Sequence, residues 1–390
     1  MVALGVAQTL AWASSTYLPA ILATPIARDL GLARSTVFGA FSVSLLVMAA
    51  IGPLAGRAID RHGGRGILVL SNLVLAAGLA ALGMAQDVAW LFGAWCVIGA
   101  GMALGLYDAA FAALVRIHGA NARSSITGIT LIAGFASTVG WPLTAWLDAN
   151  VGWRNACFVW AGLHLALGIP LNAWFIPRTG DKPQAQGTAA NAPIHAPLEP
   201  GQRGQAFWLL ALFSAVTAFV TSALAAHLPG LLAAMGAGTA AAVMASALLG
   251  PAQVAARFAE FAAANRLRFH PLASARVATA LHPLGALLLL VFGGPPLMAA
   301  VFAVLHGAGN GMITIAKGTL PLALFGPQGY GLSQGWLGVG ARCMQAAAPW
   351  VFGLVLEAGG GSAALALSAT ISVVAFGTLL AMPGVRPRGR

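Results

Sequence analysis

The sequence predicts an all-helical polytopic membrane protein, with twelve transmembrane helices arranged as two pseudo-symmetric six-helix bundles. Its 390 residues are 59% hydrophobic and only 7% charged, whereas a soluble domain carries about 25% charged residues. So much apolar surface must face lipid, where only helices and closed barrels satisfy every backbone polar group. The apolar runs are about 20 residues long and do not alternate with polar residues, which favours helices over barrel strands.

The apolar runs fall into two sets of six expected spans. The first set covers 3–25, 35–56, 66–86, 89–115, 125–148 and 155–177. The second set covers 206–234, 239–258, 273–293, 297–323, 332–356 and 363–382. The stretch between them is rich in proline, glycine and glutamine, which is typical of a solvated linker. We therefore expect an N-terminal bundle over 1–177, a cytoplasmic linker over 178–205 and a C-terminal bundle over 206–390.

Four short motifs of the first set recur in the same order in the second set, at offsets between 198 and 210 residues. The four pairs are Leu18-Pro19 with Leu228-Pro229, Gly52-Pro53 with Gly250-Pro251, Gly99-Ala100-Gly101 with Gly307-Ala308-Gly309, and Pro142 with Pro349. A nearly constant offset indicates an internal duplication, which is common in membrane transport proteins.

The net charge of +11 follows the expected topology and does not gather into a nucleic-acid patch. Of the twenty Lys and Arg residues, all but five fall on one side of the expected spans. Three lie on the other side, Arg28, Arg34 and Arg154, while Lys317 and Arg342 fall inside spans. Basic loops stay on the cytoplasmic side. We therefore expect a multi-pass protein of a bacterial-type inner membrane with both termini in the cytoplasm, and no nucleic-acid partner.

The first basic loop concentrates charge directly after an apolar run, in the pattern Gly56-x-x-x-Asp60-Arg61-x-Gly63-x-Arg65. This pattern resembles the signature loop between the second and third helices of the major facilitator superfamily, and with the repeat and the topology the resemblance covers the whole chain. It implies two bundles that rock around a central site, and a loop that docks them at the cytoplasmic side. The gating residues it implies are Gly56, Asp60, Arg61 and Arg65. The alternative is that these charges only determine topology.

Within the superfamily, three stretches look most similar to the monocarboxylate and oxalate/formate branch. They are the short loop 28–34, Arg123 at the start of the fifth span, and Gly152-Trp153-Arg154 before the sixth. Two other family patterns are missing. The fifth span has Gly140-Trp141-Pro142 where drug/proton antiporters have Gly-Pro-x-x-Gly-Gly, and the fourth carries Asp108 in place of the arginine common in proton-coupled members.

Asp108 is the leading functional candidate because it lies inside the fourth apolar run, eight residues before Arg116. A carboxylate at a helix centre costs roughly 2.5 to 3.5 kcal/mol on insertion scales, so it must meet water, a cation or a proton. Burial favours its protonated form and a nearby cation its ionised form. We interpret Asp108 as the proton-coupling residue; the alternative is a structural partner between helices.

Lys317 and Arg342 are the two basic residues inside spans ten and eleven. Lys317 lies 209 residues after Asp108, close to the repeat offset, and the resemblance places both residues along the central path. An ammonium can hold an anion, and an arginine can clamp a carboxylate with two parallel hydrogen bonds. We interpret both as substrate-binding residues; the alternative is a buried pair that specifies packing.

Three further polar residues are expected to line the path. Tyr17 and His227 each precede a Leu-Pro pair in repeat-related spans, and Asn310 lies one turn before Thr314 in the tenth span. A histidine inside a span is more often a packing residue than a ligand, and we interpret the three others at 164, 282 and 306 in that way.

These observations predict a secondary transporter that moves a small solute, an organic anion such as a monocarboxylate, by proton-coupled alternating access. Its expected partners are the anionic substrate, protons and the lipid bilayer, and we expect a monomer. No catalytic set, metal spacing or cofactor motif is present in the sequence, so no enzyme activity is expected. Two alternatives stay open: an exporter of drugs or metalloids, and a non-transporting membrane sensor or scaffold.

Overall fold

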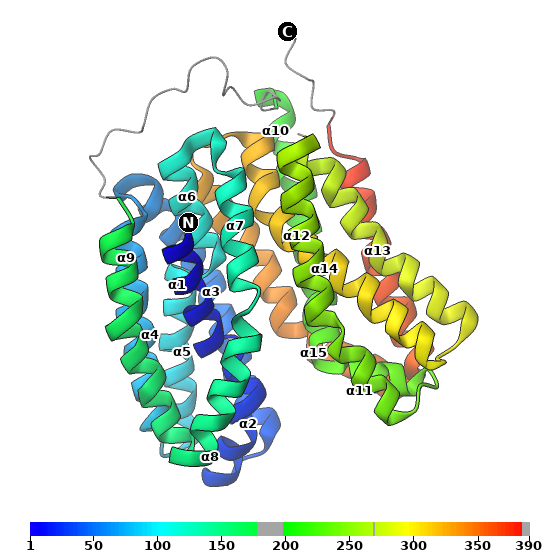
Figure 1. The fold of residues 1–390 in the computed structure, drawn as a ribbon, viewed down its shortest axis with the longest axis horizontal. Helices are drawn as coiled ribbons and strands as arrows, with labels where there is room; N and C mark the ends of the chain where they lie inside the picture. The colour runs from blue at the N-terminus through cyan, green and yellow to red at the C-terminus, as the bar shows by residue number, and fades with distance from the viewer. Residues whose placement is uncertain (178–197, 268–269, 384–390) are drawn as a thin grey trace. The chain divides into compact units, whose positions relative to one another are not determined.

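The computed structural model describes residues 1–177, 198–267 and 270–383, and every regular element in these ranges is helical (Figure 1). The first half contains α1 (Val2–Ser14), α2 (Leu18–Asp29), α3 (Arg34–His62), α4 (Gly64–Gly83), α5 (Val88–Gly105), α6 (Tyr107–His118), η1 (Gly119–Asn121), α7 (Arg123–Ala133), α8 (Ala136–Leu163), the π-helix η2 (His164–Gly168) and α9 (Ile169–Phe175). The second contains α10 (Pro200–Ala234), α11 (Thr239–Ala247), α12 (Leu249–Leu267), α13 (Pro271–Phe292), α14 (Pro296–Phe325) and α15 (Tyr330–Leu380).

Nine helical stretches in the described ranges are long and apolar enough to cross a membrane. The all-helical membrane class is therefore confirmed, while twelve spans in two bundles stay a prediction. Two of the nine, 123–175 and 330–380, are much longer than one span needs. Each contains a glycine with positive φ, Gly152 (80°) and Gly360 (71°), at the two points where the sequence predicts loops.

The described residues form two compact units. The first holds the described part of 1–192 together with 327–339, and the second holds the described part of 193–326 together with 340–390. The assignment of 327–339 to the first unit has no counterpart in the predicted domains. Most of the predicted linker, 178–197, lies outside the described residues. Its last residues are helical, because α10 begins at Pro200 and proline is preorganised for a first helical position.

The first unit packs α4 against α5 and α8, and α3 against α5. Large side chains fill its interior, including Trp95, Phe111 and Trp160, each at most 2% exposed. Its outer surface is apolar as well: Trp146 is 60% and Trp174 is 76% exposed. Apolar side chains both inside and outside are expected of a protein in lipid, because the surface that faces the lipid tails is itself apolar.

In the second unit α14 lies beside α12 and α13 (Figure 1). Its core contains Phe219, Phe302 and Phe352, each at most 3% exposed. Trp208 and Trp350 are more than 70% exposed on its surface, which again fits a lipid-facing exterior.

A buried polar chain crosses the first unit. The His164 Nε2 atom lies 2.8 Å from the Ser14 Oγ atom, and its Nδ1 atom lies 2.8 Å from the Asn72 Oδ1 atom. The Asn72 amide donates onward to the Leu68 carbonyl at 2.7 Å. All three side chains are at most 4% exposed. Each polar atom therefore finds a partner from another helix or from its own turn, as a dry interior demands.

We predict that His164→Phe destabilises the protein by about 1–2 kcal/mol, because the buried Asn72 oxygen loses its partner. The measurement is the thermal unfolding midpoint of the purified protein in detergent, with the exposed His118→Gln as a control. Adding Asn72→Leu to His164→Phe removes both partners, so the double variant should lose less stability than the two single changes added together. Strictly additive losses would contradict the hydrogen bond.

Candidate functional site

Asp60, one of the predicted gating residues of the signature segment, caps the start of α15. Asp60 lies in the last turns of α3, and its carboxylate accepts hydrogen bonds from the Gly331 amide at 2.9 Å and the Leu332 amide at 2.8 Å. These amides lie in the first turn of α15, where no intrahelical acceptor is available. A negative charge at this end also matches the helix dipole. Asp60 therefore satisfies two backbone donors and an electrostatic preference at once.

Glycines bring α3 and α15 close enough for this cap. Gly52 and Gly56 on α3 face Gly335 and Gly331 on α15, and each pair is four residues apart. A methyl group added at Gly56 would overlap the Gly331 carbonyl, and one added at Gly335 would lie 2.6 Å from the Gly52 carbonyl oxygen. This is the small-residue crossing of membrane helices. Of the other predicted gating residues, Arg61 is exposed and Arg65 is half-buried.

Asp108 lies directly after a break in the expected fourth span. α5 ends at Gly105, Leu106 has extended backbone, and Asp108 is the second residue of α6. The Gln8 side chain donates to the Gly105 carbonyl at 2.6 Å, so a carbonyl freed by the break finds a partner from α1. The break gives α6 an N-terminus inside the unit, and a carboxylate in the first turn of a helix is favoured there.

The half-buried Asp108 side chain also contacts α15. The Gln334 side-chain amide donates to the Asp108 Oδ1 atom at 3.3 Å, and Gln334 is only 4% exposed. The Oδ2 atom lies 3.3 Å from the place that a Cβ atom on Gly338 would take. Gly331, Gln334 and Gly338 lie three and four residues apart, hence on one helix face. The structure thus brings Asp60 and Asp108, predicted separately, to one face of α15.

Tyr17 lies between α1 and α2 and belongs to an aromatic cluster. Its ring centroid is 6.2 Å from that of Trp12 and 5.8 Å from that of Trp141. Trp12 in turn lies 4.9 Å from Tyr107, the residue before Asp108. Tyr17 is therefore linked to the region of Asp108 through ring contacts.

In the second unit, Lys317 is a half-buried residue of α14, and Asn310 lies seven residues before it, two turns away on the same face. Arg342 on α15 is half-buried and donates to the Gln345 side chain at 2.8 Å. The Gln345 carbonyl accepts from Ser222 on α10 at 2.9 Å. The amide acceptor leaves the positive charge of Arg342 unneutralised in this bond.

His227 has a structural hydrogen bond. Its Nε2 atom donates to the Pro349 carbonyl at 2.8 Å, and its ring lies 5.7 Å from that of Phe352. The bond joins α10 to α15. Each of these helices carries a proline, Pro229 or Pro349, that the predicted repeat relates to a proline of the first unit. His227 therefore helps to hold the unit together, whatever else it contacts.

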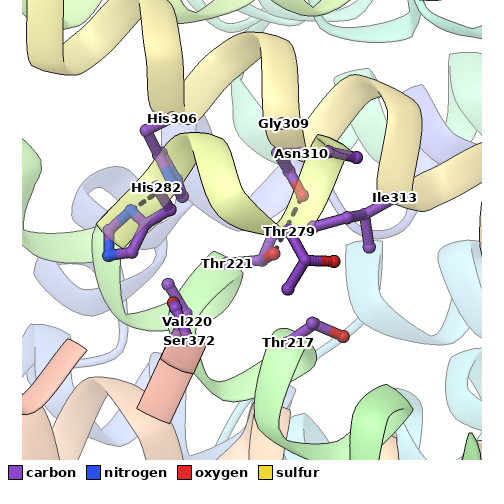
Figure 2. A pocket seen from close by; sticks show the side chains of 11 residues that line it. Thr217, Val220, Thr221, Thr279, His282, His306, Gly309, Asn310, Ile313 and Ser372 are labelled. Atoms are coloured by element: carbon purple, nitrogen blue, oxygen red, sulfur yellow. Dashed lines mark hydrogen bonds between the residues drawn. The ribbon is translucent and has the colours of Figure 1, made fainter. Parts of the chain in front are cut away.

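A small pocket opens between α10, α13, α14 and α15, and Figure 2 shows its lining. Its polar lining residues are Thr217, Thr221, Thr279, His282, His306, Asn310 and Ser372. Thr221 donates to the Asn310 side-chain oxygen at 2.8 Å. Of the substrate-binding residues predicted in this unit, Asn310 lines this pocket, and its lining includes neither Lys317 nor Arg342 nor His227.

The sequence interpretation missed Gly331 and Gln334, and it took His282 and His306 for packing residues only. Gln334 offered one signal, because an amide inside an apolar run has a cost. His282 offered another, because it lies 210 residues after Asn72, which equals the offset of the Leu-Pro pairs. Among the described residues, no group of three or more His, Cys, Asp or Glu side chains is placed to hold a metal ion.

Apolar helices that carry acids and bases inside their spans are typical of polytopic membrane proteins such as transporters. The sequence matches the family model described as Major Facilitator Superfamily over residues 4–292. The chain therefore belongs to the major facilitator superfamily. The resemblance of the signature loop is confirmed at the level of the superfamily, whereas its monocarboxylate and oxalate/formate branch stays a prediction.

Curated relatives are distant. Multidrug resistance protein MdtH of Klebsiella pneumoniae is 29% identical over 151 residues, which cover 38% of this chain and 37% of that protein. The match thus spans well under half of the relative's length. An uncharacterized 38 kDa protein of Thermoproteus tenax is 28% identical over 95% of this chain and 92% of its own.

Two solved structures share the fold over nearly the whole chain. The human organic anion transporter MFSD10 (TETRAN) has a TM-score of 0.71 at 18% identity, with 97% of both chains covered. The E. coli fucose:proton symporter FucP has a TM-score of 0.71 at 15% identity, with 98% of both chains covered. At these identities the likeness shows the fold alone.

We predict that Asp60→Asn loosens the first turn of α15, since its amide group replaces one acceptor oxygen with a donor and removes the charge. The expected loss is about 0.5–2 kcal/mol, as for other helix caps. Hydrogen exchange at the Gly331 and Leu332 amides should quicken by the matching factor. The neighbouring, exposed Arg61→Gln is the matched control and should leave both amides unchanged; equal exchange in the two variants would refute the cap.

Proposed function

We propose that this chain is a secondary transporter that moves a small organic anion by alternating access in two six-helix bundles, with Asp108 as the proton carrier. We place it in a bacterial-type inner membrane, as a monomer with cytoplasmic termini. The observation that carries the proposal is the position of Asp108, a half-buried carboxylate at a helix break inside an apolar stretch, bonded to a buried amide.

The bond from Gln334 supports a proton carrier because an amide donor suits both charge states. It donates to an oxygen of the carboxylate, and it donates equally to the carbonyl oxygen of the protonated acid. Asp108 can then gain or lose a proton without breaking this contact. The cost of an ionised carboxylate among apolar helices favours a site that exchanges protons.

Lys317 and Arg342 support an anionic substrate. Both are half-buried cations within membrane-spanning helices of the second unit, and such cations are retained for pairing with acceptors or for ligands. The guanidinium of Arg342 donates to the neutral Gln345 amide, and a guanidinium fork matches the two oxygens of a carboxylate. The organic anion transporter among the fold neighbours fits the same substrate class.

Drug export is the second candidate, since part of the chain is similar to a multidrug resistance protein. An exporter of apolar cations would be hindered by cations in its spans. Resistance of a sensitive host that expresses this chain, lost with Asp108→Asn and unaffected by changes at Lys317 and Arg342, would favour this candidate over anion transport.

We predict that Asp108→Asn abolishes accumulation driven by a pH gradient while exchange of substrate across the membrane continues, because the amide cannot carry a proton. The assay is uptake of radiolabelled formate and lactate into proteoliposomes, with and without an imposed gradient. The control Asp87→Asn removes an exposed carboxylate that caps α5 and should keep accumulation. Full accumulation by Asp108→Asn would disprove the proton role.

We predict that Lys317→Ala and Arg342→Ala each raise the KM for the anion roughly tenfold or more, because a hydrogen bond to a charged group contributes about 1.5–3 kcal/mol. The exposed Arg28→Ala outside the spans is the matched control for loss of positive charge. Unchanged KM values in both variants would rule out the anion site, and a parallel rise with Arg28→Ala would point to a general charge effect.

A further inference from the structure

Two histidines form a contact inside the second unit that neither the family nor the proposed function accounts for. His282 on α13 and His306 on α14 are 5% and 4% exposed, and their Nδ1 atoms lie 2.9 Å apart (Figure 2). The His282 Nε2 atom lies 3.2 Å from the Ser368 Oγ atom on α15. The two rings meet edge to face, with centroids 4.8 Å apart, and the His306 ring stacks on Phe302.

The short distance between the two Nδ1 atoms fixes how many protons the pair holds. Two bare nitrogens or two N–H groups would repel each other at 2.9 Å, so one Nδ1 atom carries a proton and the other accepts it. Both rings therefore cannot be imidazolium at the same time. The pair can take up one proton beyond its neutral state, and only one.

The Ser368 hydroxyl indicates where that proton binds. Its single proton goes to the Leu365 carbonyl at 2.9 Å, the shorter of its two contacts, so His282 Nε2–H donates to the Ser368 oxygen. The His282 Nδ1 atom is then the acceptor, and His306 Nδ1–H is the donor. A neutral His306 consequently has a bare Nε2 atom, which is the open base of the pair.

The pocket beside His306 presents lone pairs. Thr217 donates to the Phe213 carbonyl and Thr279 to the Ala275 carbonyl, each at 2.7 Å, and Thr221 donates to the Asn310 oxygen. Because each hydroxyl has one proton, the three oxygens turn lone pairs to their surroundings. These lone pairs suit a proton donor, and the pocket lining includes neither of the two cations, Lys317 and Arg342, at which the anion site is proposed.

The charged residues to consider on the neighbouring helices α12, α13 and α14 are Arg257, Glu260, Arg276 and Lys317. Arg257 on α12 donates to the Gly311 carbonyl and the Thr314 hydroxyl, and Arg276 on α13 donates to the Leu379 carbonyl. Lys317 lies eleven residues after His306 on α14, about three turns away, and Glu260 is a buried residue of α12. Within the described residues, none of these four lines the pocket, and α10 and α15 contribute only hydroxyl groups to its polar lining.

We propose that the pair of His282 and His306 is a second proton-binding site, which takes one proton at the His306 Nε2 atom and lies in a different unit from Asp108. Uptake forms one N–H bond and gives a His306 imidazolium, whose Nδ1–H continues to donate to His282. The site binds its proton whether or not Asp108 drives transport.

Nitrogen NMR on the full-length protein, with isotope-labelled histidine in lipid vesicles without substrate, tests this proposal. Spectra are compared between about pH 8 and about pH 5, the range over which histidines titrate. We expect one hydrogen-bonded Nδ1 pair at high pH, and one additional protonated nitrogen from this pair at low pH. His306→Gln should abolish that uptake and His282→Gln the Nδ1 pair, whereas the exposed His118→Gln should change neither.

Several results would overturn the proposal. The first is that both rings stay neutral at the low pH, and the second is that the pair takes up two protons. The third is that the wild-type spectrum shows no hydrogen-bonded Nδ1 pair, and this last measurement does not depend on the folding of any variant. Stoichiometric shifts of both rings on adding Zn²⁺ would assign the site to a metal instead. The number of protons that the pair takes up should be the same in Asp108→Asn. The measurement therefore tests the histidine pair even if the transport proposal is wrong.

Discussion

The hydrogen bonds that the first amides of α15 donate to Asp60 fix the start of this helix against α3 in the first unit. Inside a membrane the free donors of a helix N-terminus need a protein acceptor, and here the acceptor comes from α3 across a crossing made of Gly52, Gly56, Gly331 and Gly335. Once α15 is fixed at its start, helical geometry fixes the residues one and two turns later. Gln334 meets Asp108 for that reason, so the signature segment supports the candidate proton site through a shared helix.

Each of the two units contains a buried polar network built around a histidine. Asn72 and His282 lie 210 residues apart, at the offset that relates the Leu-Pro pairs. In the first unit Asn72 bonds to His164, and Ser14 occupies the other ring nitrogen. In the second, His282 bonds to Ser368 and to His306, a residue that lines a pocket. The first network thus has a partner for both ring nitrogens of its histidine, whereas in the second we propose that the remaining nitrogen of His306 binds a proton.

The sequence predicted those parts of the structure that have a large energetic cost in lipid. Composition and the length of the apolar runs indicated a helical membrane protein, and Asp108 was found because a charge among apolar residues is expensive. Asp60 was found through the resemblance of its loop to the superfamily signature. Gly331 and Gly335 were not found, since 49 glycines occur and only the pairing of distant helices selects two of them. The break at Leu106 was not predicted because no proline lies in this part of the sequence. The histidine pair joins α13 to α14, a contact that periodicity does not report.

Asp60 and Asp108 contact the same face of α15 but differ in what their partners allow. Two backbone amides at a helix N-terminus can only donate, and they present the positive end of the helix dipole to Asp60. The Gln334 side-chain amide can donate to Asp108 both as the acid and as the carboxylate. Because both carboxylates accept from residues near the start of one helix, a displacement of that helix start would change the donors at Asp60 and at Asp108 together.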